Sequence, residues 1–298
     1  IPRAAACSAF FIVSSGRRCE SVSPLQMLNL ENIACSELCL SEDIITENSA
    51  RSITEVAFSS LNSNSHDPTR SNLSVNKTII ILAGNHKIGL RAVATARHIQ
   101  NHGFNTVLCV LGLEQESELL AGLKFQVNLF RNFEGIVMNK TELFEYVAKL
   151  DTPPDLIIDG LMGIAISFEE LRIGDQTTVY ELISWANRHK APVLAIDIPT
   201  GIDPTTGEIN VIDGRPLYLF PQYVVSLGAP KRGLLETMAL GQGIIRDDNH
   251  GKDTEWQIYV ADIGLGDATW KKTGTKTRKG VDFEGSWIQK LRFKRAAE

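Results

Sequence analysis

Several features that would identify common protein classes are missing from this sequence. No apolar run approaches the roughly 18 residues of a membrane-spanning helix, so we expect no contact with the membrane interior. The GxSxG and HExxH patterns are absent and the six histidines are scattered, which leaves serine-hydrolase and zinc-hydrolase mechanisms without support. The five cysteines contain no CxxC pair, which argues against a structural zinc site. Basic residues are not in excess either, because 30 Lys and Arg stand against 35 Asp and Glu, for a net charge of −5.

The composition is that of an ordinary globular protein. The chain has 298 residues, of which 43% are hydrophobic and 22% are charged. A chain of this length buries roughly three quarters of its unfolded surface and needs no disulfide or metal to hold a core. Because it begins at Ile1, we expect it to be part of a longer protein.

The order of the predicted elements favours one fold class. Helical periodicity at 24–38 and 42–58 is followed by a polar segment at 59–76, after which short apolar runs alternate with amphipathic helices. This alternation predicts an α/β protein, a Rossmann-like three-layer α/β/α sandwich with a mostly parallel central sheet. The predicted strands are 78–83, 105–111, 125–130, 156–159, 193–197, 223–227 and 257–260, with an edge strand at 287–291.

We divide the chain into an N-terminal tail, residues 1–23, and one domain, residues 24–298, with a polar loop at about 271–286. Residues 271–298 contain nine basic and three acidic side chains, so positive charge is concentrated at this end. Such a run is either a solvated loop and tail or a set of phosphate contacts.

Polar motifs follow four of the predicted strands, and the carboxyl ends of parallel strands are where ligands bind in such sheets. Gly84 and Gly89 have the spacing of a phosphate loop, but Leu90 and Arg91 stand where its Lys and Ser/Thr belong. The turn either presents backbone N–H groups to an anion or only joins a strand to a helix.

Three charged residues end other predicted strands. Asp159 and Asp197 could act as acid and base, could hold a cation, or could cap the helices that follow. Lys231, between Pro230 and Gly233, suits an anion or an acid/base role.

The motifs resemble the YjeF-N domain family over about residues 24–298. The matching segments are 46–51, 154–163, 193–207, 225–234 and 260–264, which include the specific DIPTG-IDPTTG sequence at 197–207. The resemblance implies a Rossmann-like fold. It also implies, for the enzymes of the family, epimerisation of hydrated NADH and NADPH with a bound nucleotide and a potassium ion at the strand ends.

The sequence departs from the enzymes of this family in the loop at 84–92. The family's GPGNNGGDG loop is replaced, with Lys87 and Ile88 in place of the asparagines, Leu90 in place of a glycine and Arg91 in place of the acidic residue. Isoleucine has no oxygen for a cation, lysine repels it, and leucine obstructs the approach of a pyrophosphate. Asp159, Asp197, Thr200 and Lys231 still match the family's positions for cation, acid/base and substrate.

The altered loop, with His86 and the Arg97-His98 pair, is similar to that of the family branch found in enhancers of mRNA decapping. That resemblance implies a non-catalytic scaffold without a required cofactor or metal, which forms homodimers, binds RNA and works with other decapping factors in cytoplasmic processing bodies. The alternatives are an active epimerase, or an inactive pocket that binds a nucleotide as a regulator.

The candidate residues fall into two sets. The inherited pocket, which we assign no catalytic residue, comprises Gly84, Asn85, His86, Lys87, Gly89, Arg91, Asp159, Gly163, Asp197, Thr200 and Lys231. The RNA candidates are Lys87, Arg91, Lys231, Arg232, Lys271 and Lys272.

Overall fold

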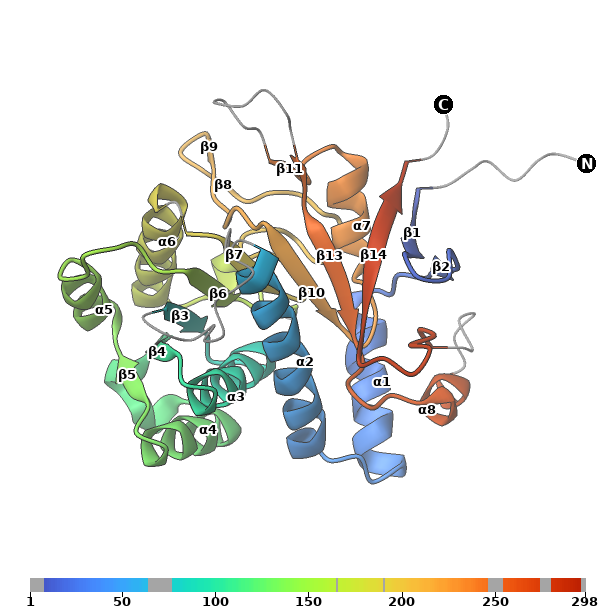
Figure 1. The fold of residues 1–298 in the computed structure, drawn as a ribbon, viewed down its shortest axis with the longest axis horizontal. Helices are drawn as coiled ribbons and strands as arrows, with labels where there is room; N and C mark the ends of the chain where they lie inside the picture. The colour runs from blue at the N-terminus through green and yellow to red at the C-terminus, as the bar shows by residue number, and fades with distance from the viewer. Residues whose placement is uncertain are drawn as a thin grey trace, which may run out of the picture.

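A ten-stranded sheet forms the centre of the molecule (Figure 1). The structure, a computed structural model, describes residues 8–63, 77–164, 166–189, 191–245, 254–273 and 280–295. The strand order is β2-β1-β14-β13-β10-β7-β6-β3-β4-β5. These strands are β1 (Ala9–Ile12), β2 (Arg18–Cys19), β3 (Thr78–Ala83), β4 (Asn105–Val110), β5 (Ile136–Met138), β6 (Leu156–Gly160), β7 (Val193–Ile196), β10 (Tyr223–Leu227), β13 (Gln257–Ala261) and β14 (Ile288–Lys294).

The sheet is parallel from β13 to β5 and antiparallel where β14, β1 and β2 join it. The prediction of an α/β fold with a mostly parallel sheet is therefore confirmed. Two short hairpins lie outside this sheet, formed by β8 (Val211–Ile212) with β9 (Arg215–Pro216) and by β11 (Ile244–Ile245) with β12 (Thr254–Glu255).

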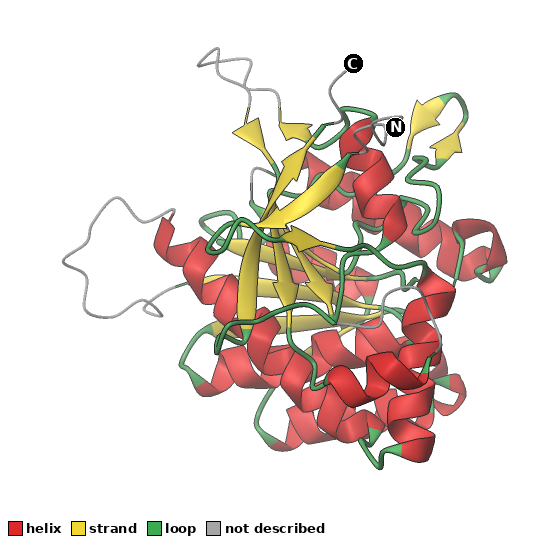
Figure 2. Cartoon of the chain, turned by 90° about the vertical axis from the view of Figure 1, so that its right-hand side faces the viewer, coloured by secondary structure: helices red, strands yellow, loops and turns green. Residues whose placement is uncertain are grey.

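Helices pack on both faces of the sheet, as Figure 2 shows from the side. They are α1 (Pro24–Glu37), α2 (Glu42–Ser63), α3 (Lys87–Asn101), α4 (Ala121–Asn132), α5 (Lys140–Val147), α6 (Ile173–Arg188), α7 (Arg232–Ala239) and α8 (Asp267–Lys272), with 3-10 turns η1 (Leu113–Glu118) and η2 (Phe168–Glu170). Strand β3 explains the two layers, because Ile79 and Ile81 belong to one apolar cluster while Ile80 and Leu82 belong to another. A continuous apolar run thus buries both faces of the strand.

Helix α1 begins where its sequence signals predict. The Ser23 hydroxyl accepts a hydrogen bond from the Gln26 backbone N–H at 3.1 Å, and the Gln26 side chain accepts one from the Ser23 N–H at 2.8 Å. This reciprocal cap, with Pro24 at the first helical position, fixes the helix start. Residues Met27, Leu30, Glu31 and Ala34 then face inward, and the acidic member of this set becomes important below.

The N-terminal residues are not a free tail, so that prediction is wrong for the part the structure describes. Strand β1 pairs antiparallel with β14, with Phe10 opposite Phe293, and β2 pairs with β1. The apolar residues of β1 are buried by a partner nearly 300 residues away in the sequence, which local pattern analysis cannot detect. For the same reason β14 is not an edge strand, because β1 covers its outer side.

Two further predictions are corrected. The segment Phe125–Phe130, predicted as a strand, lies in α4, where Leu123, Val127 and Phe130 are buried at helical spacing. Lys271 and Lys272 end helix α8 and do not lie in a polar loop, while 274–279 of that predicted loop lie outside the described residues. Across the described ranges, no helix combines the length and the apolar character that crossing a membrane requires.

Candidate functional site

The four predicted motifs meet at one edge of the sheet, since β10, β7, β6 and β3 are consecutive strands. Asp159 lies at the end of β6, next to Ala195 of β7, and Asp197 directly follows β7. The site therefore combines residues from separate parts of the chain, as the strand pattern predicted.

Asp159 is a buried carboxylate whose oxygens are occupied by the protein. Its oxygens accept hydrogen bonds from the Thr200 backbone N–H at 2.8 Å, the Thr200 hydroxyl at 2.7 Å and the Leu161 N–H at 3.2 Å. Burial raises the pKa of Asp159 to about 6, although the hydrogen bonds from Thr200 oppose this. These bonds tie the loop after β6 to the loop after β7.

Lys231 and Asp197 form an ion pair with no solvent contact at the lysine. The Lys231 side chain is 0% exposed, and its ammonium donates to Asp197 Oδ1 at 2.5 Å, the Leu227 carbonyl at 2.8 Å and the Ala229 carbonyl at 3.0 Å. An ammonium has three N–H groups, so every donor is used. Asp197 also accepts from the Leu227 N–H at 2.8 Å, and its φ of +68° is rare for a residue with a side chain. The pair is fixed, and a substrate would have to displace one of these bonds to reach it.

His86 fills the glycine turn that follows β3. Its ring caps α3, with Nδ1 accepting from the Gly89 N–H at 3.2 Å and Nε2 2.9 Å from the Leu161 carbonyl. Nε2 is therefore the protonated nitrogen, and burial lowers the pKa of His86 to about 4. A Cβ on Gly84 would lie 2.4 Å from Nε2, and one on Gly163 would lie 3.0 Å from Nδ1, so both glycines make room for this ring.

The substituted residues of the loop form an ion cluster with α1 and α2. Arg91, 1% exposed, donates to both oxygens of Glu31 at 3.0 and 2.8 Å and to Glu42 at 3.0 Å. Lys87 is 2.7 Å from Glu42 and 3.4 Å from Glu31. Although burial works to raise it, the charge of Arg91 holds the pKa of Glu31 below its usual range. We call Glu31, Glu42, Lys87 and Arg91 the buried ion cluster.

Sequence analysis missed the two acidic members of the buried ion cluster. Glu31 lies 60 residues before Arg91, and only its place among the inward-facing positions of α1 could have indicated a buried partner. A buried carboxylate requires a cation nearby, but the sequence does not say which one.

The residues do not fit the potassium ion that the family resemblance implies. Hard cations need several oxygen ligands, and Ile88 offers none. Asn85 uses its oxygen to accept from the Leu120 N–H at 2.8 Å and its amide to donate to the Glu118 carbonyl at 3.3 Å. Asp159 already accepts three hydrogen bonds. Within the described ranges there is also no group of three or more His, Cys, Asp or Glu side chains that could hold a metal.

The cavity at the strand ends is small and carries no positive charge. It encloses about 210 Å³, and it is lined in part by Gly163, Thr200, Glu170 and Asp203. No Lys or Arg lines it, and neither Asp197 nor Lys231 is among its lining residues. A phosphate placed there would have Glu170 and Asp203 as its charged neighbours and no cationic side chain.

The RNA candidates divide by exposure. Arg91 and Lys231 are buried and ion-paired, so the structure contradicts their assignment as surface phosphate contacts. Lys87 is 40% exposed but held by Glu42. The side chain of Arg232 is 65% exposed and lies 3.7 Å from Glu236. The last two candidates lie together at the end of α8, where Lys271 is exposed and Lys272 is 2.6 Å from Glu37.

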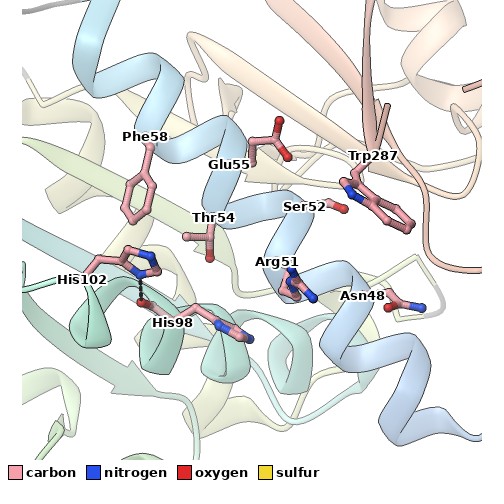
Figure 3. Close-up of a pocket in the computed structure, with 9 residues that line it drawn as sticks. All are labelled: Asn48, Arg51, Ser52, Thr54, Glu55, Phe58, His98, His102 and Trp287. Carbon is pink, nitrogen blue, oxygen red and sulfur yellow. Dashed lines mark hydrogen bonds between the residues drawn. The ribbon is translucent and has the colours of Figure 1, made fainter. Parts of the chain in front are cut away.

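A larger cavity lies away from the strand ends, against the outer face of α2 (Figure 3). It encloses about 310 Å³ between α2, His98 of α3, His102 just after α3, and Trp287. Trp287 is 64% exposed, which is unusual for so large an apolar side chain. We call this cavity the α2 groove. Its residues are Asn48, Arg51, Ser52, Thr54, Glu55, Phe58, His98, His102 and Trp287.

Comparison with known proteins finds relatives with different names. The chain is 25% identical over 265 residues to enhancer of mRNA-decapping protein 3 of Schizosaccharomyces pombe, a match that covers 88% of this chain and 50% of that protein. It is 26% identical over 244 residues to an NAD(P)H-hydrate epimerase of Leuconostoc citreum, covering 82% and 90% of the two chains. The chain thus spans about half the length of the decapping relative.

The fold is also found in a solved structure. The crystal structure of the yeast protein ynu0 superposes with a TM-score of 0.68 at 20% identity, covering 91% of this chain and 99% of the other. A family model described as YjeF-related protein N-terminus matches residues 42–233. Since that match spans more than half of the chain, the protein belongs to the YjeF-N family.

Proposed function

We propose that this chain is a non-catalytic domain of an mRNA-decapping enhancer, which forms homodimers, binds RNA and acts with other decapping factors in cytoplasmic processing bodies. The relative from S. pombe supports the link to decapping. The main support for a non-catalytic role is that all three N–H donors of the Lys231 ammonium are hydrogen-bonded inside the protein. A general acid or base must come within hydrogen-bond reach of its substrate, and this group has no free donor and no exposed surface.

The buried ion cluster supports the same conclusion. Arg91 and Lys87 stand where the family's enzymes carry ion-binding and phosphate-binding residues, and both are bound to carboxylates of α1 and α2. The positive charges therefore hold the helices of this protein together and are not available to a ligand.

An epimerase assay tests this part of the proposal. Hydrated NADH and NADPH are incubated with the purified chain and, in parallel, with the Leuconostoc epimerase. We expect no turnover above background for this chain. Turnover within about a hundredfold of the active relative would contradict the proposal.

Epimerase activity is the second candidate, and one observation favours it. Asp197 and Lys231 remain paired and Asp159 remains at the end of β6, in a chain that covers most of an NAD(P)H-hydrate epimerase. If this reading is right, Lys231→Ala abolishes turnover that the unaltered chain displays. If the unaltered chain has no turnover, or if Lys231→Ala retains it, this candidate fails.

A regulatory nucleotide is a third candidate. The cavity beside Gly163 and Thr200 offers space at the strand ends, and two acidic residues but no Lys or Arg line it. We therefore expect NADH and ATP to leave the melting temperature of the chain unchanged. An upward shift that saturates with nucleotide concentration would revive this candidate.

The α2 groove supports homodimerisation through a second copy of the chain. Arg51 and Glu55 are exposed in this groove, and their side chains make no hydrogen bond or ion pair with any residue that the structure describes. A twofold axis would place Arg51 of each copy opposite Glu55 of the other copy. The two charges on one helix face would therefore form two ion pairs between the copies. Phe58 and the exposed Trp287 flank them and supply the apolar anchor that dimer interfaces need.

Light scattering on the purified chain tests dimerisation directly. We expect the mass of a dimer at micromolar concentration. A mass of 32.8 kDa at every concentration would contradict the scaffold proposal.

A further inference from the structure

The antiparallel end of the sheet exposes one face. In β14, Lys290, Arg292 and Lys294 are exposed, while the alternate residues Gln289 and Leu291 are buried and Phe293 is half-buried. Alternate residues of a strand point to opposite faces, so the three cations lie together on the solvent side. Figure 1 shows β14 and β1 beyond the layer formed by α2 and α3.

The pairing register extends this face over four strands. Phe11 of β1 lies between Arg18 of β2 and Arg292 of β14, in one row across the sheet. Tyr259 of β13, which is itself buried, lies opposite Lys290 in the neighbouring row. Directly paired residues share a face, so the register fixes which side chains are neighbours. We call Phe11, Arg18, Tyr259, Lys290, Arg292 and Lys294 the basic sheet face.

The charge of this region is opposite to that of the whole chain. The four strands Ala9–Ile12, Arg18–Cys19, Gln257–Ala261 and Ile288–Lys294 contain no acidic residue, in a protein whose net charge is −5. Apart from Arg18, which pairs with Glu20 at 2.9 Å, none of the four cations of the face has an ion pair with a described residue. A local positive potential of this kind attracts a polyanion even when the net charge is negative.

Aromatic rings lie among the cations. The Lys294 ammonium is 4.7 Å from the centre of the Phe11 ring, and the Lys290 ammonium is 5.7 Å from that of Tyr259. Phe11 is half-buried, so part of its side chain reaches solvent. Aromatic rings placed among exposed cations form an arrangement in which unpaired bases stack on the rings while the cations contact phosphates.

We infer that the basic sheet face binds single-stranded RNA, with Arg18, Lys290, Arg292 and Lys294 on the phosphates and Phe11 under a base. The inference rests on the proposed RNA-binding function and gives it a location. It replaces Arg91 and Lys231, which are buried and cannot reach a polynucleotide. In the strand order, the strands of the basic sheet face (β2, β1, β14 and β13) lie on one side of β10. Strands β6 and β3, whose end loops form the inherited pocket, lie on the other side.

A titration of variants tests the location. Fluorescence anisotropy with a labelled single-stranded 20-nucleotide RNA is measured between 50 and 200 mM salt. Lys290→Glu with Arg292→Glu should raise the dissociation constant at least about tenfold and lower the salt slope by about 1.4, because each lost phosphate contact removes about 0.7 from the slope. Phe11→Leu keeps an apolar side chain but removes the ring, so it should weaken binding about threefold or more with the slope unchanged.

The matched control is Lys149→Glu, a charge reversal at an exposed lysine after α5, at the other end of the sheet. It should bind RNA like the unaltered chain. Thermal melting of each variant establishes that the fold is intact, since all these side chains reach the surface.

The outcomes separate the two proposals. If the unaltered chain binds RNA and the face variants bind equally well, the basic sheet face is wrong and RNA binding by another surface stands. If the unaltered chain binds no RNA, the proposed function fails and this inference fails with it. If the face variants lose binding to an acidic peptide or to phosphatidylserine vesicles while RNA binding is unchanged, the face serves another partner and the inference is overturned.

Discussion

Arg91 of α3 and Glu31 of α1 are joined by two parallel hydrogen bonds of 3.0 and 2.8 Å, and both side chains are almost completely buried. Such a bidentate pair is the strongest geometry available to these two groups. It holds the first helix of the chain against the helix that begins at the glycine turn. A residue of the segment at 84–92, which follows β3, therefore contributes here to packing.

Removing one partner of this pair should be strongly destabilising. Arg91→Leu leaves Glu31 buried with Lys87 alone, 3.4 Å away, and we expect a loss of about 3–5 kcal/mol in the free energy of unfolding. Urea denaturation followed by circular dichroism measures it. The double variant Arg91→Leu with Glu31→Leu leaves no unpaired buried charge, so it should recover most of the loss. A cost below about 1 kcal/mol for Arg91→Leu would show that the pair does not support the fold.

Lys231 should resist chemical modification in the folded protein. Its ammonium is 0% exposed and donates three hydrogen bonds, whereas Lys149 is exposed. We expect an amine-acylating reagent to label Lys149 at least about tenfold faster than Lys231, because the reagent reaches Lys231 only when the site opens. Mass spectrometry of the labelled peptides gives both rates, and denaturant should make them equal. Equal rates in the folded state would mean that the strand ends are open.

The buried His86 should make stability depend on pH. Its pKa falls from 6.5 to about 4 on folding, so below pH 6.5 the unfolded chain binds a proton that the folded chain excludes. This contribution to stability is complete above pH 6.5 and decreases by about 3 kcal/mol as the pH falls to 4. Asp159 acts in the opposite sense, since its raised pKa favours the folded state at low pH and that contribution is lost as the pH rises through about 6.

Comparison with a variant isolates the histidine. His86→Asn keeps a good helix cap but does not titrate, and Asp159 is common to both proteins. The difference in unfolding free energy between the two should therefore change by about 3 kcal/mol in favour of His86 between pH 4 and 6.5. A difference that is constant over this range would mean that His86 is not buried as a neutral ring.

Charge exchange on α2 should identify the dimer contact. Arg51→Glu places two glutamates opposite each other across the twofold axis, and Glu55→Arg places two arginines there, so each variant should weaken the dimer about tenfold or more. The variant that carries both substitutions restores opposite charges across the axis and should dimerise like the unaltered chain. Sedimentation equilibrium gives the three dissociation constants. Equal weakening in the double variant would exclude this pairing.

The sequence predicted six of the seven strands of the parallel sheet, because each of the six is a local signal, and it missed the short strand β5. The residues of β3 form a short, wholly apolar run between turn residues, which is typical of a strand covered on both faces. The prediction of a strand at Phe125–Phe130 was wrong, also because of a local signal. A short apolar run fits either period, and the burial of Leu123, Val127 and Phe130 is decided by the neighbouring α3.

The candidate site could be predicted as a set of residues but not as a set of contacts. The motifs placed Asp159, Asp197 and Lys231 at strand ends, and the structure has them there. Whether Arg91 faces a ligand or a helix depends on Glu31, 60 residues away. The packing of α1 decides whether Arg91 contacts a ligand or a helix. The composition of the loop at 84–92 does not indicate how α1 packs.

The position of β14 has a consequence for any fragment of this protein. It is the last described strand of the chain, yet its hydrogen bonds to both β13 and β1 make it the only link between the first strands and the rest of the sheet. A polypeptide shortened before Ile288 would thus lose β14, and the paired strands β1 and β2 would have no strand to pair with at this end of the sheet. A nascent chain likewise cannot complete this end of the molecule until synthesis has passed Lys294.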